Sequence, residues 1–81
     1  MARHTVTIKK MAYQPTPLNV ANGDEVVWDN QDKVPHTATF TFATTGTING
    51  GSVSGPIRFS QAGTHDYTCD FHDMTGRVVV K

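Results

Sequence analysis

The sequence predicts an all-β protein, a Greek-key β-sandwich of about seven to eight short strands. Several segments alternate apolar and polar residues with a period of two, while no stretch of about ten residues shows the period of an α-helix. Turn residues recur at intervals of roughly ten residues, as between the strands of a sandwich. Charged residues make up only 17% of the chain, which also suits an all-β protein.

Three strands are expected in the first part of the chain, at residues 4–8, 18–20 and 25–29. Residues 13–17 contain two prolines, which favour an extended edge segment or a turn. The Asn22-Gly23 pair is a strong signal for a hairpin turn. The alternation places Val26 and Trp28 on one face of the strand that follows.

The second part of the chain is expected to contain four strands, beginning near Pro35, Ile57, Thr64 and Arg77. In the first of these, the alternation assigns His36 to the core face and Thr37 to the solvent face. Residues 44–55 are polar and rich in glycine, so we expect a loop there, with at most a short strand around Ile48. Five aromatic residues are predicted to lie in the core: Trp28, Phe40, Phe42, Phe59 and Tyr67.

The chain length, the number of cysteines and the balance of charges limit the size of the core and the class of partner. A chain of 81 residues is expected to form one domain, residues 1–81, that buries about 60% of the surface of its unfolded form. With Cys69 as its only cysteine it has no intramolecular disulfide, and a bound metal is the other common support of a small fold. Seven basic residues balance seven acidic ones, which argues against nucleic acid or an anionic membrane as partner.

No apolar stretch is long enough to span a bilayer, and no signal peptide is present in the sequence. Met1-Ala2 resembles a translation start placed on a mature chain, which is compatible with a removed export signal. We expect a monomer.

Four residues carry the chemistry. Cys69 ends a predicted strand, His72 follows three residues later, and Met74 two residues after that. His36 begins a distant strand on its core face, so a sandwich can gather all four at one end. Two imidazoles and a thiolate in a trigonal arrangement, with a methionine sulfur at a long axial distance, form the ligand set of blue-copper electron-transfer centres. We therefore predict one copper ion, cycling between Cu(I) and Cu(II), whose binding weakens as protons compete for the ligands at low pH.

The chain resembles the cupredoxins, particularly the plastocyanin, pseudoazurin and amicyanin group, over essentially its whole length. The matching stretches are residues 22–30, 34–37, 63–69 and 74–80, with a proline before His36 and a Gly-Thr-x-x-Tyr-x-Cys strand ending at Cys69. The resemblance implies a cupredoxin-like sandwich, a soluble type 1 copper protein that shuttles single electrons between redox partner proteins, and an extracytoplasmic location, periplasmic or at the cell surface. It also implies that His72 reaches the surface, and that partners dock there.

Two features depart from the family pattern. Only Asp73 separates His72 from Met74, whereas even the short ligand loops of the family usually leave two residues. Three choices for the fourth coordination position therefore stay open: Met74, a water molecule or a backbone carbonyl near Pro35. A position left vacant would leave three ligands and admit small molecules. The second departure is a pair of acidic residues, Asp70 and Asp73, that flank the exposed histidine. This pair predicts a partner whose docking face is positively charged.

Simpler interpretations compete for each residue. Cys69 could be a buried structural thiol, Met74 could pack under the last strand, and zinc could replace copper with Asp73 or water as fourth ligand. His4 and His65 are expected to be hydrogen-bonded core or rim histidines, with a second metal site shared between them as the alternative.

Two other functions compete with electron transfer. A copper carrier or store would use the same ligands, but carriers favour exposed Met- or Cys-rich sites. An enzyme is not expected, because multicopper oxidases and copper nitrite reductases need His-x-His or His-Cys-His patterns, and neither occurs in this sequence. A binuclear copper centre would need two cysteines, and the chain has one.

Overall fold

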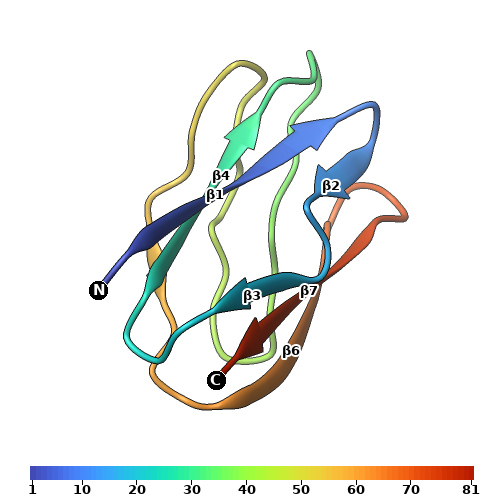
Figure 1. Ribbon diagram of the computed structural model, residues 1–81. Coiled ribbons are helices and arrows are strands. Elements are labelled where there is room, and N and C mark those ends of the chain that lie inside the picture. Colours follow the sequence, from blue (N-terminus) through green and yellow to red (C-terminus); the bar gives the residue numbers. More distant parts are fainter.

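A computed structural model describes residues 1–81 and contains seven β-strands and no helix (Figure 1). The all-β prediction is therefore confirmed. None of its elements is a helix of the length and hydrophobicity that crossing a bilayer requires. The strands are β1 (Arg3–Lys9), β2 (Ala12–Gln14), β3 (Leu18–Val20), β4 (Glu25–Asn30), β5 (Ile57–Arg58), β6 (Gly63–Thr68) and β7 (Thr75–Val80).

The strands form two facing sheets, one with the order β2-β1-β4-β5 and the other with the order β3-β7-β6. Two of the pairings, β1 with β4 and β3 with β7, are parallel, and the remaining pairings are antiparallel. Parallel neighbours need a crossover rather than a hairpin. The chain accordingly passes between the sheets, as Figure 1 shows for the segment from β3 to β4.

The turn at Asn22-Gly23 exists, but the hairpin predicted there is wrong. This turn joins β3 to β4, and these two strands belong to different sheets. The hairpin signal marked a tight turn correctly, but which strands pair is decided by core burial across the whole chain.

The strand predicted from Pro35 onward is wrong as a continuous strand. The segment makes only isolated bridges, from His36 to Ile48 and from Thr39 to both Thr44 and Thr68. Its alternation also fails at two positions, because Thr37 is 2% exposed and Phe42 is 53% exposed. Thr37 is buried because it forms hydrogen bonds with Cys69 and Asp70. An apolar–polar pattern does not reveal such partners. The loop predicted at residues 44–55 is present, with Ile48 buried in it.

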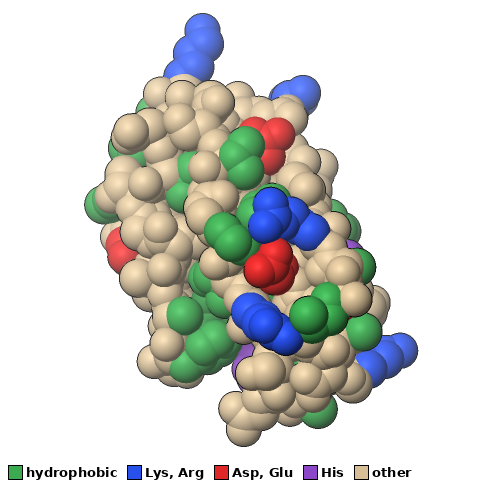
Figure 2. Space-filling model, turned by 90° about the vertical axis from the view of Figure 1, so that its left-hand side faces the viewer, with side chains coloured by type: hydrophobic (Ala, Val, Ile, Leu, Met, Phe, Trp, Pro, Cys, Tyr) green, Lys and Arg blue, Asp and Glu red, His purple; other side chains and the backbone are tan.

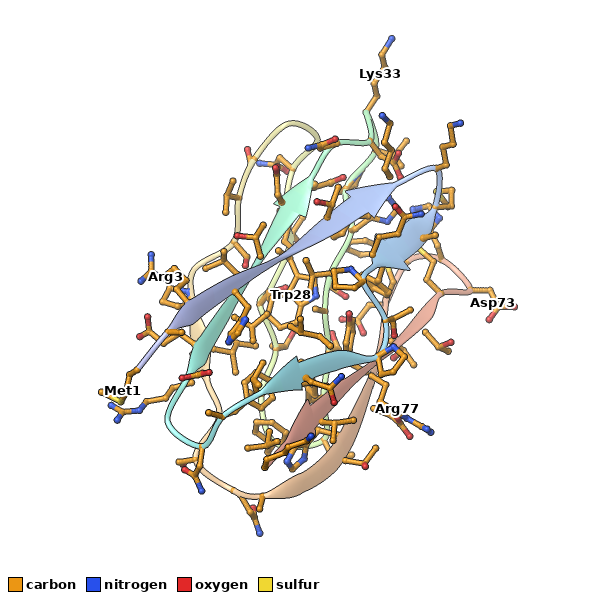
Figure 3. The ribbon with its side chains drawn as sticks, in the orientation of Figure 1. Met1, Arg3, Trp28, Lys33, Asp73 and Arg77 are labelled. Atoms are coloured by element: carbon orange, nitrogen blue, oxygen red, sulfur yellow. The ribbon has the colours of Figure 1, made fainter.

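The core between the sheets is one cluster of 17 buried apolar residues. Trp28 lies in its middle (Figure 3), with its ring 5.5 Å from that of Tyr67 and 5.9 Å from that of Phe40 in edge-to-face arrangements. Such aromatic pairs contribute about 0.5–1.5 kcal/mol each beyond their area of burial. Four of the five predicted core aromatics are buried, and Phe42 is the exception.

Close packing extends to the backbone of β7. A Cβ atom at Gly76 would lie 2.2 Å from Cζ of Tyr67, so only glycine lets the strand cross the tyrosine ring at this distance. Tyr67 is thereby fixed two residues before Cys69. The last core strand thus has a direct packing connection to the end of the molecule where the predicted ligands lie.

The charged side chains are mixed over the surface. In the face shown in Figure 2, basic and acidic groups lie next to each other rather than gathering by sign. Arg3 and Glu25 form an ion pair of 3.0 Å, and Arg77 and Asp66 form one of 2.7 Å, with all four side chains at least 38% exposed. Exposed pairs of this kind contribute little to stability.

One acidic residue is different, because Asp24 is buried at the start of β4. Its carboxylate accepts hydrogen bonds from the backbone N–H of Ala2, from Nε2 of His4 and from the backbone N–H of Ala21, at 2.8, 2.8 and 2.9 Å. The bond from Ala2, followed by those from His4 and Ala21, holds the pKa of Asp24 well below its usual range, against the opposing effect of desolvation. The carboxylate therefore ties the first strand to the turn before β4.

We predict that this group contributes to the acid sensitivity of the fold. Because the folded-state pKa of Asp24 is depressed, its stabilisation is present above the unfolded value of about 3.9 and is lost as pH falls from there toward the folded value. The melting temperature of the wild type should therefore fall more steeply between neutral and strongly acidic pH than that of Asp24→Asn. Thermal unfolding at a series of pH values measures this, and parallel curves for the two proteins would contradict it.

Candidate metal centre

Three segments bring the predicted ligands to one end of the sandwich. His36 follows the loop after β4 and is held there by reciprocal backbone hydrogen bonds with Ile48, at 3.1 and 2.8 Å. Cys69 is the first residue after β6, and His72 and Met74 lie in the short loop between β6 and β7. In Figure 1 this loop lies beside β2. The fold thus assembles residues that are more than thirty positions apart in the sequence.

His36 and Cys69 face each other in the buried part of this end. Nδ1 of His36 lies 3.7 Å from Sγ of Cys69, and neither side chain is appreciably exposed. The ring of His72 packs edge-to-face against that of His36, with ring centroids 4.9 Å apart. His72 is half-buried. One thiol and two imidazoles therefore meet where the interior opens to the surface.

Thr37 fastens the segment that carries His36 to the segment that carries Cys69. Its backbone N–H donates to Sγ of Cys69 at 3.4 Å, and its side-chain oxygen accepts a bond from the backbone N–H of Asp70 at 2.9 Å. Its carbonyl accepts the hydroxyl proton of Tyr13 from β2. The sulfur that receives this N–H is the atom through which a cysteine binds metals, as the thiolate.

Tyr13 is a neutral donor in this arrangement. Burial, followed by the nearby Cys69 and Tyr67, raises the pKa of Tyr13 far above its usual value. The phenol therefore keeps its proton at neutral pH and donates it in the hydrogen bond to the Thr37 carbonyl. Its ring packs edge-to-face on Tyr67, with centroids 4.6 Å apart, which connects the site to the aromatic core.

His36 has a fixed partner on its other nitrogen. Nε2 lies 2.9 Å from a carboxylate oxygen of Asp32, and since a carboxylate only accepts, Nε2 carries the proton. Desolvation acts to raise the pKa of Asp32, but the hydrogen bonds from the Met11 N–H, from His36 and from the Lys10 N–H outweigh it and lower that pKa below its ordinary value. Nδ1 is consequently the free nitrogen that faces Cys69.

The short loop after β6 closes on itself. The backbone N–H of Met74 donates to the carbonyl of His72 at 2.9 Å, and the N–H of Cys69 donates to the carbonyl of Met74 at 3.2 Å. Met74 is buried, so the single intervening residue, Asp73, turns outward at the edge of the loop (Figure 3). The role of the Met74 sulfur as an axial ligand stays a prediction.

The residues at this end fit a soft, one-electron metal. Nε2 of His72 is buried without any hydrogen-bond partner, and a native buried polar atom of this kind calls for an explanation. A metal ligand is one explanation consistent with the adjoining thiol and imidazole. No group of three or more His, Cys, Asp or Glu side chains is arranged as a ready metal cluster, so the His36–Cys69 pair is the part of the site already assembled.

The structure also identifies three supporting residues that the sequence pattern did not single out: Thr37, Asp32 and Tyr13. Thr37 was assigned to the solvent face, and the roles of Asp32 and Tyr13 depend on contacts across the sequence. The position of Asp32, four residues before His36, was the only local signal available.

His4 and His65 each have a partner of their own. His4 bonds to Asp24 at 2.8 Å, and Nε2 of His65 lies 2.9 Å from the carbonyl oxygen of Gln61. His65 packs beside Phe42 and Phe59, with ring centroids 5.4 and 5.9 Å away. The hydrogen-bonded rim histidines predicted from the sequence agree with this arrangement.

Comparison with known proteins points to one family. A family model described as a cupredoxin-like domain matches residues 1–80. Amicyanin from Paracoccus denitrificans is 36% identical over 86 residues, covering 94% of this chain and 63% of that protein. Amicyanin from Paracoccus versutus is 31% identical over 83 residues with the same coverage. The chain thus spans a little under two thirds of the length of these relatives, 63% in each case.

Solved structures agree with the sequence matches. A reduced Cu(I) form of an amicyanin variant superposes with a TM-score of 0.86 at 33% identity, covering 95% of this chain and 80% of that one. An oxidised amicyanin variant gives a TM-score of 0.88 at 32% identity with the same coverage. A purple cupredoxin from Nitrosopumilus maritimus, at 24% identity, shares the fold with a TM-score of 0.86 over 95% of this chain and 98% of its own.

Proposed function

The chain belongs to the cupredoxin-like family, and from that premise we propose that it binds one copper ion and carries single electrons between redox partners. The observation that carries the proposal is the buried pair formed by Cys69 and His36, with Sγ and Nδ1 3.7 Å apart and the His72 ring against that of His36. His36, Cys69 and His72 would hold the copper, and the sulfur of Met74 would be a weaker fourth ligand. The relatives are amicyanins, and solved structures of amicyanin include Cu(I) forms.

Copper bound there supplies a one-electron couple between Cu(I) and Cu(II). The protein residues contribute a site that changes little between the two states. Thr37, Asp32 and Tyr13 fix the ligands through hydrogen bonds to buried groups, so neither ligand segment can move without breaking several of them. Hydrogen bonds to the residues that ligate a metal fix the orientation of those residues and adjust the affinity and reduction potential of the metal.

The docking surface in this proposal surrounds His72. Phe71 beside it is 51% exposed and Val34, two residues before His36, is 41% exposed, which gives the surface an apolar centre. Asp70 and Asp73 are exposed on the same loop and add negative charge at its edge. A partner with a positive rim and an apolar contact patch fits this surface. We further propose a monomeric, extracytoplasmic electron carrier rather than an enzyme.

Copper binding is the first prediction to test. Titration of the metal-free protein with Cu(II) should produce an intense thiolate-to-copper absorption band that saturates at one equivalent. Cys69→Ser should abolish the band, because the band requires the thiolate, while His65→Ala should leave it unchanged, since His65 lies outside the site. Copper binding without such a band, or a band retained in Cys69→Ser, would contradict the proposal, whereas zinc uptake in preference to copper would favour the zinc alternative.

Met74 is tested by removing its sulfur. Met74→Leu keeps an apolar side chain of similar volume, so the fold should be preserved at a cost below about 1.5 kcal/mol. If the sulfur is axial, the absorption band and the reduction potential should both change, since the axial ligand tunes both. A spectrum and a potential identical to those of the wild type would show that Met74 only packs under β7.

The acidic edge of the docking surface predicts a salt-dependent rate. Electron transfer to a positively charged redox partner should slow as ionic strength rises, because salt screens exposed charges beyond about 10 Å at 0.1 M. The double variant Asp70→Asn/Asp73→Asn should lose most of this salt dependence, while Glu25→Gln, at the start of β4, should retain it. Stopped-flow rates at several salt concentrations measure this, and a wild-type rate that does not fall with salt would count against the surface.

A further inference from the structure

Asp32 joins His36 to a turn in another part of the sheet. Strands β1 and β2 are connected by a two-residue turn, Lys10-Met11, since Lys9 pairs with Ala12. Both turn residues have positive φ, 53° and 59°, a conformation that L-residues other than glycine rarely adopt. Their backbone N–H groups donate to the two carboxylate oxygens of Asp32, at 2.7 and 3.0 Å.

The same carboxylate also accepts a hydrogen bond from Nε2–H of His36, on the oxygen that the Met11 N–H contacts. All three neighbours of the carboxylate are therefore donors, and the group that suits them is one that only accepts. An asparagine has a similar shape but carries an NH2 group, which would face a donor. Asp32 is largely buried, with a side chain 15% exposed, so a mismatch there is not relieved by water.

The loop that carries Asp32 is held in place by hydrogen bonds of the Asn30 side chain. The side-chain oxygen of Asn30 accepts the backbone N–H of Asp32 at 3.0 Å, and its NH2 donates to the carbonyls of Val34 and Ile48, both at 2.9 Å. Gly50 packs directly on this loop, since a Cβ atom there would lie 2.7 Å from the carbonyl oxygen of Asp32. The carboxylate is thus held in position from its own backbone as well as from the turn.

We propose that Asp32 is a positioning residue for the metal centre, which fixes His36 with its proton on Nε2 and Nδ1 free, and that the Lys10-Met11 turn holds it in that position. The proposal rests on the proposed function, because it takes His36 to be a copper ligand. An anionic partner increases the basicity of a ligating imidazole, and therefore favours Cu(II) over Cu(I). The turn then acts on the reduction potential from outside the ligand shell.

The first experiment uses the metal-free protein. In the wild type, ¹⁵N–¹H NMR of the His36 imidazole should show a single tautomer with a slowly exchanging Nε2 proton. Asp32→Asn should give a mixture of tautomers or a rapidly exchanging proton. Asp29→Asn removes the same charge from a neighbouring residue that bonds to Gln31, and should leave the wild-type signal. A wild-type His36 signal in Asp32→Asn would overturn the proposal.

The second experiment measures copper. Loss of an outer-sphere partner typically lowers metal affinity by about 10–100-fold, and here Cu(II) should be affected more than Cu(I). A tenfold greater loss for Cu(II) raises the reduction potential by about 59 mV, so Asp32→Asn should have a higher potential than the wild type, and Asp29→Asn should not. An equal rise in both variants would assign the effect to charge alone and overturn the positioning role.

A folding control keeps the test decisive. If Asp32→Asn alone does not fold, the same substitution is made with Lys10→Asn and Met11→Gly, because Asn-Gly forms this turn without outside help. The K10N/M11G background itself keeps both turn amides and should retain the wild-type potential. If the wild type gives no thiolate-to-copper band, the proposed function fails, and the NMR experiment still decides the role of Asp32.

Discussion

The contact on which the candidate site depends most is the one between Thr37 and the end of β6. Through its backbone N–H, its hydroxyl and its carbonyl, this single buried residue joins the His36 segment to Cys69, to Asp70 and to Tyr13 of β2. The His36 segment makes only isolated bridges to its neighbours, so sheet pairing does not place it. The polar contacts of Thr37, together with the reciprocal backbone hydrogen bonds between Thr39 and Thr68 at 2.8 and 3.0 Å, therefore hold the His36 segment against Cys69.

The remaining support comes from the aromatic core and from the loop that carries Asp32. Tyr13, Tyr67 and Trp28 form a continuous packed series from the site to the middle of the sandwich, which limits motion of β2 and β6. On the opposite side of His36, Asn30 and Asp32 fix the loop by hydrogen bonds. A small domain has little apolar surface to bury, and here a network of buried polar contacts supplements it at the end that carries His36 and Cys69.

Much of this could be predicted from sequence, and the failures have a common physical cause. Alternation and turn residues located the strands, and the spacing of Cys69 and His72 with a distant His36 picked out residues that the fold brings together. The errors fall on the hairpin at Asn22-Gly23, the strand from Pro35, Thr37 and Phe42. Each depends on which distant segment covers it, which a local period cannot express. Asp32 and Tyr13 escaped notice for the same reason, since their significance lies in partners more than twenty residues away.

The fold itself, before any metal binds, holds the segment of His36 and the segment of Cys69 together, with Thr37 as the main contact. Hydrogen exchange of the backbone amides of Thr37 and Asp70 in the metal-free protein tests this most directly, because these amides donate to Sγ of Cys69 and to the Thr37 hydroxyl. Both amides should be protected to nearly the same degree as the amides of β6 and β7, and adding Cu(I) should change that protection little. Amides that exchange freely without metal and become protected only when copper is added would show that the metal, rather than the fold, organises the site.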